Sequence, residues 1–188
     1  MKKNEDVEVE NIFEDKSKKK INSKIKGKRT ELEVVKELNK RFQKILSKNP
    51  SWGSFSRTIG SGNRWSHNVF MSKKTMEQFS GDIVCPENFN FVLESKGGYN
   101  NIDLCGGFSK GLAEIDKFLK QVMEDSTRIQ KKPMLFWKKD YKPRLCFLKS
   151  KDLEIKELNK FEYYMKYKEW IIISFKDLFE LKDDFFFN

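Results

Sequence analysis

Residues 81–96 read Gly-Asp-Ile-Val-Cys-Pro-Glu-Asn-Phe-Asn-Phe-Val-Leu-Glu-Ser-Lys, and this stretch decides the expected fold. Two apolar runs flank a turn-rich Pro-Glu-Asn segment, a pattern typical of a β-hairpin. If the turn is centred on Asn88, Asp82 directly faces Glu94 across the two strands. The sequence therefore predicts that two acidic side chains meet on one face of a sheet.

This acidic pair points to metal-dependent chemistry. Directly opposed residues have Cβ atoms about 4.5–5.5 Å apart, and like charges at that separation destabilise a sheet unless a positive charge lies between them. Lys96 follows Glu94 by two positions, so it lies on the same face. Hard oxygen ligands suit Mg²⁺, or Mn²⁺ in its place, better than zinc. Such a metal would polarise a scissile phosphate and acidify a bound water, while Lys96 would orient that water or stabilise developing charge.

A third acid is expected nearby from the first predicted helix, at 28–46. Its apolar residues recur at three- and four-residue spacings and form one stripe. Glu31 lies on this inward stripe near the helix start, where it could complete a metal shell directly or through water. The stripe consists of Leu32, Val35, Leu38, Phe42, Ile45 and Leu46.

The remaining pattern predicts an α/β fold with a central mixed sheet flanked by helices. A second amphipathic helix is expected around 112–123, then strands at 133–137 and 145–148 that pair through the turn at 140–143. After a partly helical segment, a short buried strand at 170–173 precedes a helix that starts at Ser174.

Composition favours one domain with a polyanionic partner. The chain has 188 residues and a formal net charge of +10, which favours nucleic acid, although a lysine-rich surface without a partner has the same composition. Residues 1–25 are predicted to be a flexible charged arm and residues 26–188 a single domain. The chain has no long apolar run, no signal-peptide core and no disulfide or zinc spacing among its three cysteines, so a cytoplasmic protein without membrane contact is expected.

The segment 56–65 is the candidate for phosphate binding because it offers guanidinium, hydroxyl and backbone amide donors: Arg57, Ser61, Gly62 and Arg64. A solvent loop with incidental arginines is the alternative. Four aromatic residues, Trp52, Trp65, Trp137 and Tyr141, could stack on bases or belong to the core. The tail Phe185-Phe186-Phe187 could cover the core or contact a second copy or another partner, and the sequence does not distinguish these.

Taken together, these features resemble the PD-(D/E)XK nucleases, and within them the archaeal and phage Holliday junction resolvases. The resemblance runs from about Lys26 to Leu148, and its pieces are Lys26-Gly27-Lys28-Arg29-Thr30-Glu31, Gly60-Ser61-Gly62, Gly81-Asp82-Ile83, Glu94-Ser95-Lys96 and Pro133-Met134-Leu135-Phe136. Gly81 stands where the motif is named for proline, Ser95 is polar where these resolvases often have a hydrophobic residue, and the loop 62–80 is long.

The resemblance implies a restriction-endonuclease-like core and a homodimer that cuts four-way DNA junctions. It implies that Asp82, Glu94 and the Ser95 carbonyl bind the metal, with Lys96 beside it, Glu31 in the shell and Gln121 near the site. Further predicted nucleic-acid contacts are Lys26, Lys28, Arg29 and Lys110.

Two alternatives to a junction resolvase remain open. One is a restriction-like, repair or RNA-directed nuclease on the same core. The other is a non-catalytic nucleic-acid-binding module, because a D…ExK string also arises by chance at an ordinary strand edge.

Overall fold

The computed structural model describes residues 23–58, 77 and 79–188, and within this part of the chain the strands form one seven-stranded mixed sheet. Neighbouring strands follow the order β1-β2-β3-β4-β5-β7-β6, in which β3 and β4 pair in parallel and the other neighbours antiparallel. The strands are β1 (Ser56–Arg57), β2 (Ile83–Val84), β3 (Phe91–Gly97), β4 (Lys132–Lys138), β5 (Arg144–Lys149), β6 (Met165–Tyr167) and β7 (Trp170–Ser174).

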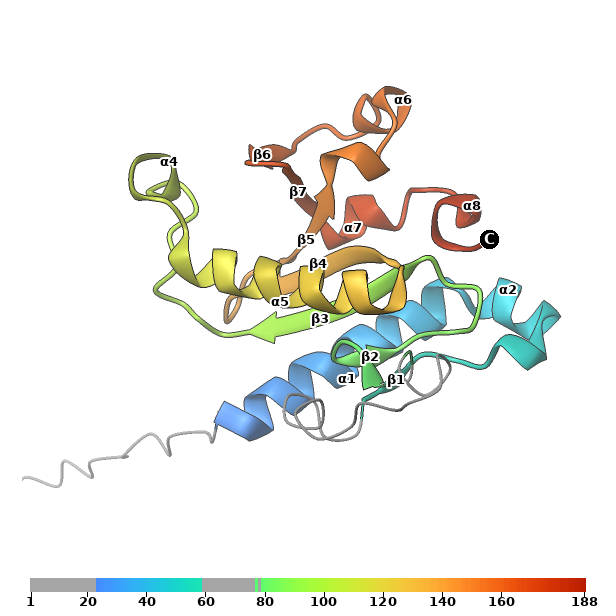
Figure 1. The fold of residues 1–188 in the computed structure, drawn as a ribbon. Helices are drawn as coiled ribbons and strands as arrows, with labels where there is room; N and C mark the ends of the chain where they lie inside the picture. Colours follow the sequence, from blue (N-terminus) through green and yellow to red (C-terminus); the bar gives the residue numbers. More distant parts are fainter. Residues whose placement is uncertain (1–22, 59–76, 78) are drawn as a thin grey trace, which may run out of the picture.

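Two long helices cover the sheet from opposite faces (Figure 1). They are α1 (Ser23–Arg41) and α5 (Ala113–Ile129). Shorter elements are α2 (Gln43–Lys48), η1 (Pro50–Trp52), α4 (Gly107–Lys110), η3 (Ser150–Asp152), α6 (Ile155–Leu158), α7 (Phe175–Leu178) and α8 (Asp183–Phe186). This architecture confirms the predicted α/β fold with a mixed sheet between helices.

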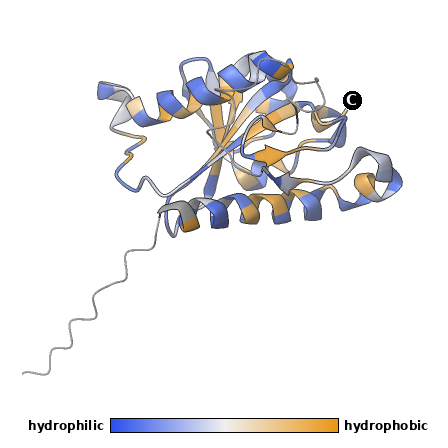
Figure 2. Cartoon of the chain, turned by 60° about the horizontal axis from the view of Figure 1, so that its bottom comes forward, coloured by the Kyte–Doolittle hydropathy of each residue, from blue (hydrophilic) through white to orange (hydrophobic). Residues whose placement is uncertain are grey.

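The central strands have apolar side chains on both faces because each face is covered. In β4, Met134 and Phe136 join the core on the side of α1, whereas Leu135 and Trp137 join the core on the side of α5. Figure 2 shows these strands as mostly hydrophobic between the two helices. Burial on both faces explains why β4, β5 and β7 read as continuous apolar runs in the sequence.

The predicted strand pairings are confirmed. Ile83 pairs with Leu93, a register that places Asp82 opposite Glu94. The strands β4 and β5 pair antiparallel with Leu135 opposite Phe147, as the turn at 140–143 predicts. Ser174 caps α7, because its hydroxyl accepts a hydrogen bond from the Asp177 N–H at 3.0 Å.

The first helix differs from its prediction in its bounds and in part of its buried stripe. It begins at Ser23, five residues earlier than expected, and Phe42 separates α1 from α2. Leu32 is 55 % exposed, so its placement in the stripe was wrong. Besides Thr30, the buried residues are Glu31, Val34, Leu38 and Phe42. Their spacings of three, four and four follow the helical period and leave Leu32 on a neighbouring, exposed face.

The phenylalanine tail covers the core. Phe186 is fully buried, and its ring packs edge-on against Phe42 with centroids 4.9 Å apart. Of the four aromatic residues considered for base stacking, Trp137 is buried in the core and Trp52 stacks on Phe187. Tyr141 is fully exposed, and Trp65 lies outside the described residues.

Among the residues described, no helix has the length and apolar character needed to cross a membrane.

Candidate active site

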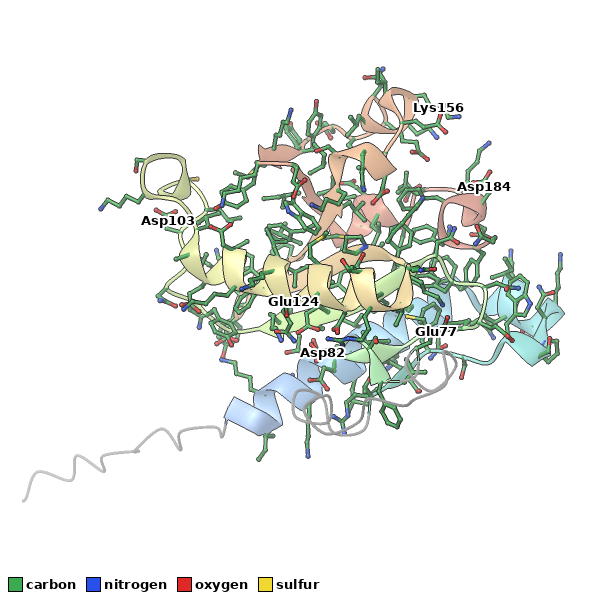
Figure 3. The ribbon with its side chains drawn as sticks, viewed as in Figure 1. Glu77, Asp82, Asp103, Glu124, Lys156 and Asp184 are labelled. Atoms are coloured by element: carbon green, nitrogen blue, oxygen red, sulfur yellow. The ribbon has the colours of Figure 1, made fainter. Side chains whose placement is uncertain are left out.

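An open cavity of about 910 Å³ lies where β3 passes between the first half of α1 and the helix α5. Figure 3 shows Asp82 below α5, in the same region as Glu124. Four predicted site residues from the hairpin, Asp82, Glu94, Ser95 and Lys96, line the cavity together with Glu31 and Gln121 from the two helices. The lining residues are Lys26, Gly27, Glu31, Phe79, Gly81, Asp82, Glu94, Ser95, Lys96, Gly97, Gly98, Tyr99, Gln121, Glu124, Asp125 and Arg128.

The hairpin brings two carboxylates and one amine together. Lys96 Nζ lies 3.6 Å from Asp82 Oδ2 and forms an ion pair with Glu94 Oε1. Both acids are buried, Glu94 completely. The Lys96 ammonium also lies 5.8 Å from the centre of the Phe118 ring on α5. The side chains of Glu94 and Lys96 therefore share one face of β3, as strand alternation predicts.

Burial and the neighbouring charges shift the pKa values of Glu94 and Lys96 in this cluster. Burial and the nearby Asp82 carboxylate raise the pKa of Glu94 well above its ordinary value, although Lys96 opposes the change. Burial lowers the pKa of Lys96, but the charges of Glu94 and Asp82 outweigh it, and the pKa of Lys96 is raised overall. Lys96 is therefore a protonated donor at neutral pH.

The donor set fits a divalent cation that keeps part of its water shell. Among the described residues, Oε2 of Glu94 has no hydrogen-bond partner, and Oε1 has the Lys96 ion pair, which is a costly arrangement for a fully buried carboxylate. Within those same residues, no three His, Cys, Asp or Glu side chains are grouped to enclose a metal. Two carboxylates with room for water and substrate phosphate suit Mg²⁺ better than a closed protein cage would.

Glu31 reaches the same cavity from α1. A Cβ atom at Gly97 would overlap the Thr30 side chain, so the missing side chain at 97 lets α1 approach the end of β3. Burial and the Asp82 charge raise the pKa of Glu31, and its Oε2 pairs with Arg57 Nη1 at 3.2 Å. Arg57, predicted to bind phosphate, is thus the ion-pair partner of a cavity acid.

Sequence reasoning missed Asp125, which holds the start of the motif. Gly81 has φ of 71°, a conformation that proline cannot adopt. Its N–H donates to Asp125 Oδ2 at 3.0 Å, a bond that proline could not make. Arg128 Nη1 lies 2.6 Å from the other Asp125 oxygen. The spacing that singled out Glu31 applies here too, because Asp125 follows the buried Val122 by three positions on the inward face of α5.

The other predicted nucleic-acid contacts are dispersed. Lys26 lines the cavity and forms an ion pair with Asp140. Lys28 and Arg29 are exposed on α1, and Arg29 pairs with Glu33. Lys110 is exposed in α4, which extends beyond the end of α5 (Figure 1), and it does not line the cavity. Ser61, Gly62 and Arg64 lie outside the described residues.

An opposed Asp82–Glu94 pair with Lys96 beside it, on a mixed sheet between two helices, matches the arrangement after which the PD-(D/E)XK nucleases are named. A family model described as "Phage putative PDDEXK endonuclease" matches residues 22–187, and the chain belongs to this family. Comparisons with curated proteins and with solved structures gave no significant match. Nucleases of this class generally use divalent metal ions.

Proposed function

We propose that this protein is a Mg²⁺-dependent endonuclease that hydrolyses phosphodiester bonds in branched DNA, most specifically a Holliday junction resolvase. The observation that supports catalysis most strongly is the buried Glu94 carboxylate, which faces Asp82 and pairs with Lys96 through Oε1, while its Oε2 has no hydrogen-bond partner among the described residues. A folded protein keeps such a group at a stability cost where binding or chemistry needs it.

Asp82, Glu94 and the Ser95 carbonyl would hold the ion, and Glu31 would complete its shell directly or through water. When bound, a divalent cation supplies charge neutralisation at the phosphate and an acidified water. Mn²⁺ has the same preference for oxygen ligands and is expected to substitute for Mg²⁺.

Lys96 acts as a donor in this scheme. The raised pKa of Lys96 keeps its ammonium charged in the metal-free site, where it can donate hydrogen bonds. The Lys96 ammonium would orient the attacking water by donating a hydrogen bond to the water oxygen. It would also stabilise the negative charge that develops on the phosphoryl oxygens. Gln121, which lines the cavity from α5, can donate or accept a hydrogen bond at the substrate.

The substrate proposal rests on charge and on resemblance. A formal net charge of +10 favours a phosphate backbone as partner. Resolution of a four-way junction needs two opposed cuts, so we propose a homodimer with one active site per subunit. A phage-encoded enzyme of this kind would act on DNA in the cytoplasm of the host cell.

The test is cleavage of a labelled four-way DNA junction beside a linear duplex and a single strand of matched sequence, with Mg²⁺ and with Mn²⁺. Symmetric cuts near the branch by the wild type, lost in Asp82→Asn, are expected. Equal cutting of linear DNA would contradict junction selectivity and leave another PD-(D/E)XK nuclease. Tight, salt-dependent binding without cleavage under either metal would instead indicate a binding module.

A further inference from the structure

Two exposed tyrosines stand at the end of the sheet that borders the cavity. Tyr99 follows β3 by two residues, lines the cavity and is 44 % exposed. Tyr141 lies in the turn between β4 and β5 and is fully exposed. Because β3 and β4 are parallel neighbours, both tyrosines follow strands that end at the same edge.

The backbone conformation at positions 99 and 141 does not favour tyrosine. Tyr99 has φ of 54° and Tyr141 has φ of 59°, in the left-handed region that Gly and Asn adopt most easily. The Lys142 N–H donates to the Lys139 carbonyl at 3.3 Å and closes the turn around Tyr141. A turn of this kind favours Gly or Asn where Tyr141 stands, so the aromatic ring needs another explanation.

A pair of polar residues joins the two segments that carry the tyrosines. The Asp140 N–H donates to Asn100 Oδ1 at 2.9 Å, and Asn100 Nδ2 donates to Asp140 Oδ2 at 2.7 Å. Lys26 from α1 forms an ion pair with the same Asp140 carboxylate. Each tyrosine is therefore the chain neighbour of a residue in this reciprocal pair, and the pair links the turn to the cavity rim.

The surroundings suit an aromatic, anionic ligand. The Tyr99 ring packs edge-on against Phe118 with centroids 4.8 Å apart, so Tyr99 is held beside the cavity while part of it stays exposed. Lys142 follows Tyr141 and Lys139 lies two residues before it, and in the described part of the chain no ion pair joins either lysine to an acid. Exposed rings next to uncompensated cations form the usual surface for unpaired nucleotides.

We propose that Tyr99 and Tyr141 form a stacking platform for nucleobases that are unpaired or unstacked at the branch beside the cut. This proposal rests on the proposed nuclease function and narrows its substrate to DNA whose bases are accessible near the scissile phosphate. Tyr99 would stack on a base at the cavity rim, and Tyr141 on a base further along the same strand.

The test is binding of two DNA molecules in metal-free buffer. One is a four-way junction that carries 2-aminopurine at the branch, and the other is a single strand that carries it at a central position. Stacking on a tyrosine changes the fluorescence of this base. The changes are expected to persist in Tyr99→Phe and Tyr141→Phe, which keep the ring. In Tyr99→Ala and Tyr141→Asn they are expected to be lost, with affinity at least about five-fold weaker. Asn tolerates the left-handed backbone, so Tyr141→Asn retains the turn.

Tyr163→Ala is the matched control, because Tyr163 is also strongly exposed but does not line the cavity. If Tyr99→Ala and Tyr141→Asn bind and alter fluorescence as the wild type does, the platform is wrong. The binding readout needs no metal and no cleavage. Wild-type stacking without cleavage in a parallel Mg²⁺ assay would therefore support the platform while contradicting the nuclease proposal.

Discussion

The backbone N–H of Ser95 donates a hydrogen bond of 3.0 Å to Oδ2 of Asp82, so one acid of the site is anchored by the strand that carries the other. The same Asp82 oxygen lies 3.6 Å from Lys96 Nζ. Asp82 thus links the short strand β2 to the motif in β3 and restricts its own carboxylate to one orientation.

Replacing Lys96 with methionine is expected to lower the cleavage rate by about 10²–10³-fold, because a preorganised cationic donor is lost. Methionine keeps an apolar side chain of similar length beside Phe118, so the fold should persist. Initial rates at saturating Mg²⁺ and thermal unfolding curves check this expectation. Lys120→Met, an exposed site on α5, is the control. Similar rates for Lys96→Met and the wild type would exclude Lys96 from the reaction.

Asp125→Ala is expected to lower kcat by about 10–100-fold with a smaller change in KM. The variant removes the acceptor that fixes the N–H of Gly81, the residue before Asp82, so the position of Asp82 becomes less defined. Asp125→Asn keeps an acceptor oxygen and should be affected less. In a Mg²⁺ titration, the cleavage rate of Asp125→Ala should rise less steeply with the Mg²⁺ concentration than the rate of the wild type. Thr127→Ala, on the exposed face of the same helix, serves as control. Equal losses in the Ala and Asn variants would mean that the negative charge matters and the Gly81 contact does not.

Glu94→Gln is expected to stabilise the metal-free protein at neutral pH while abolishing cleavage. The pKa of Glu94 is raised above its ordinary 4.5 in the folded state, so the unfolded chain releases this proton first. As pH rises from about 4.5 towards the folded-state pKa, this group therefore lowers the free energy of unfolding. Removing the charge should restore about 1–3 kcal/mol.

Urea unfolding in EDTA at pH 5 and pH 7.5 measures this effect. The wild type should lose more stability than Glu94→Gln between the two pH values. Added Mg²⁺ should raise the unfolding temperature of the wild type and leave that of the variant unchanged. A Glu94→Gln protein that is less stable than the wild type in EDTA would mean that the Lys96 ion pair outweighs burial.

Phe186→Ala is expected to lower the free energy of unfolding by about 3–5 kcal/mol, because a fully buried ring at the centre of an aromatic cluster is removed. Tyr164→Ala, an exposed aromatic, should change it by less than about 0.5 kcal/mol. Chemical denaturation checks both values. Unchanged stability with an altered oligomeric state on gel filtration would instead assign the tail to a subunit contact.

The parts of the fold that repeat a short period could be predicted from the sequence. The hairpin register followed from side-chain alternation and a turn centre, and the structure pairs Ile83 with Leu93 accordingly. The inward position of Glu31 followed from helical spacing, and the residue is buried. Leu32 was misplaced because it lies 100° around the helix from Glu31, so the two side chains cannot both face the core. The burial of Val34 shows that the core lies on the side of Glu31.

Contacts between distant segments could not be predicted in the same way. The hydrogen bond from Gly81 to Asp125 joins residues 44 positions apart, and no local pattern encodes it. The burial of Phe186 against Phe42 likewise depends on where the chain returns after β7. The contribution of segment 59–76 to the site remains a prediction, since Ser61, Gly62 and Arg64 are outside the described residues.

The most direct test that Asp82, Glu94 and Lys96 form the active site is cleavage of a labelled four-way junction over a Mg²⁺ titration. The wild type, Glu94→Gln and Asp184→Asn are compared. Asp184 is an exposed acid on α8, well away from Asp82 in Figure 3, and controls for loss of one negative charge. We expect Mg²⁺-dependent cuts near the branch from the wild type and Asp184→Asn, abolished by EDTA and absent in Glu94→Gln. Cleavage by Glu94→Gln at the wild-type rate would contradict this assignment of the active site.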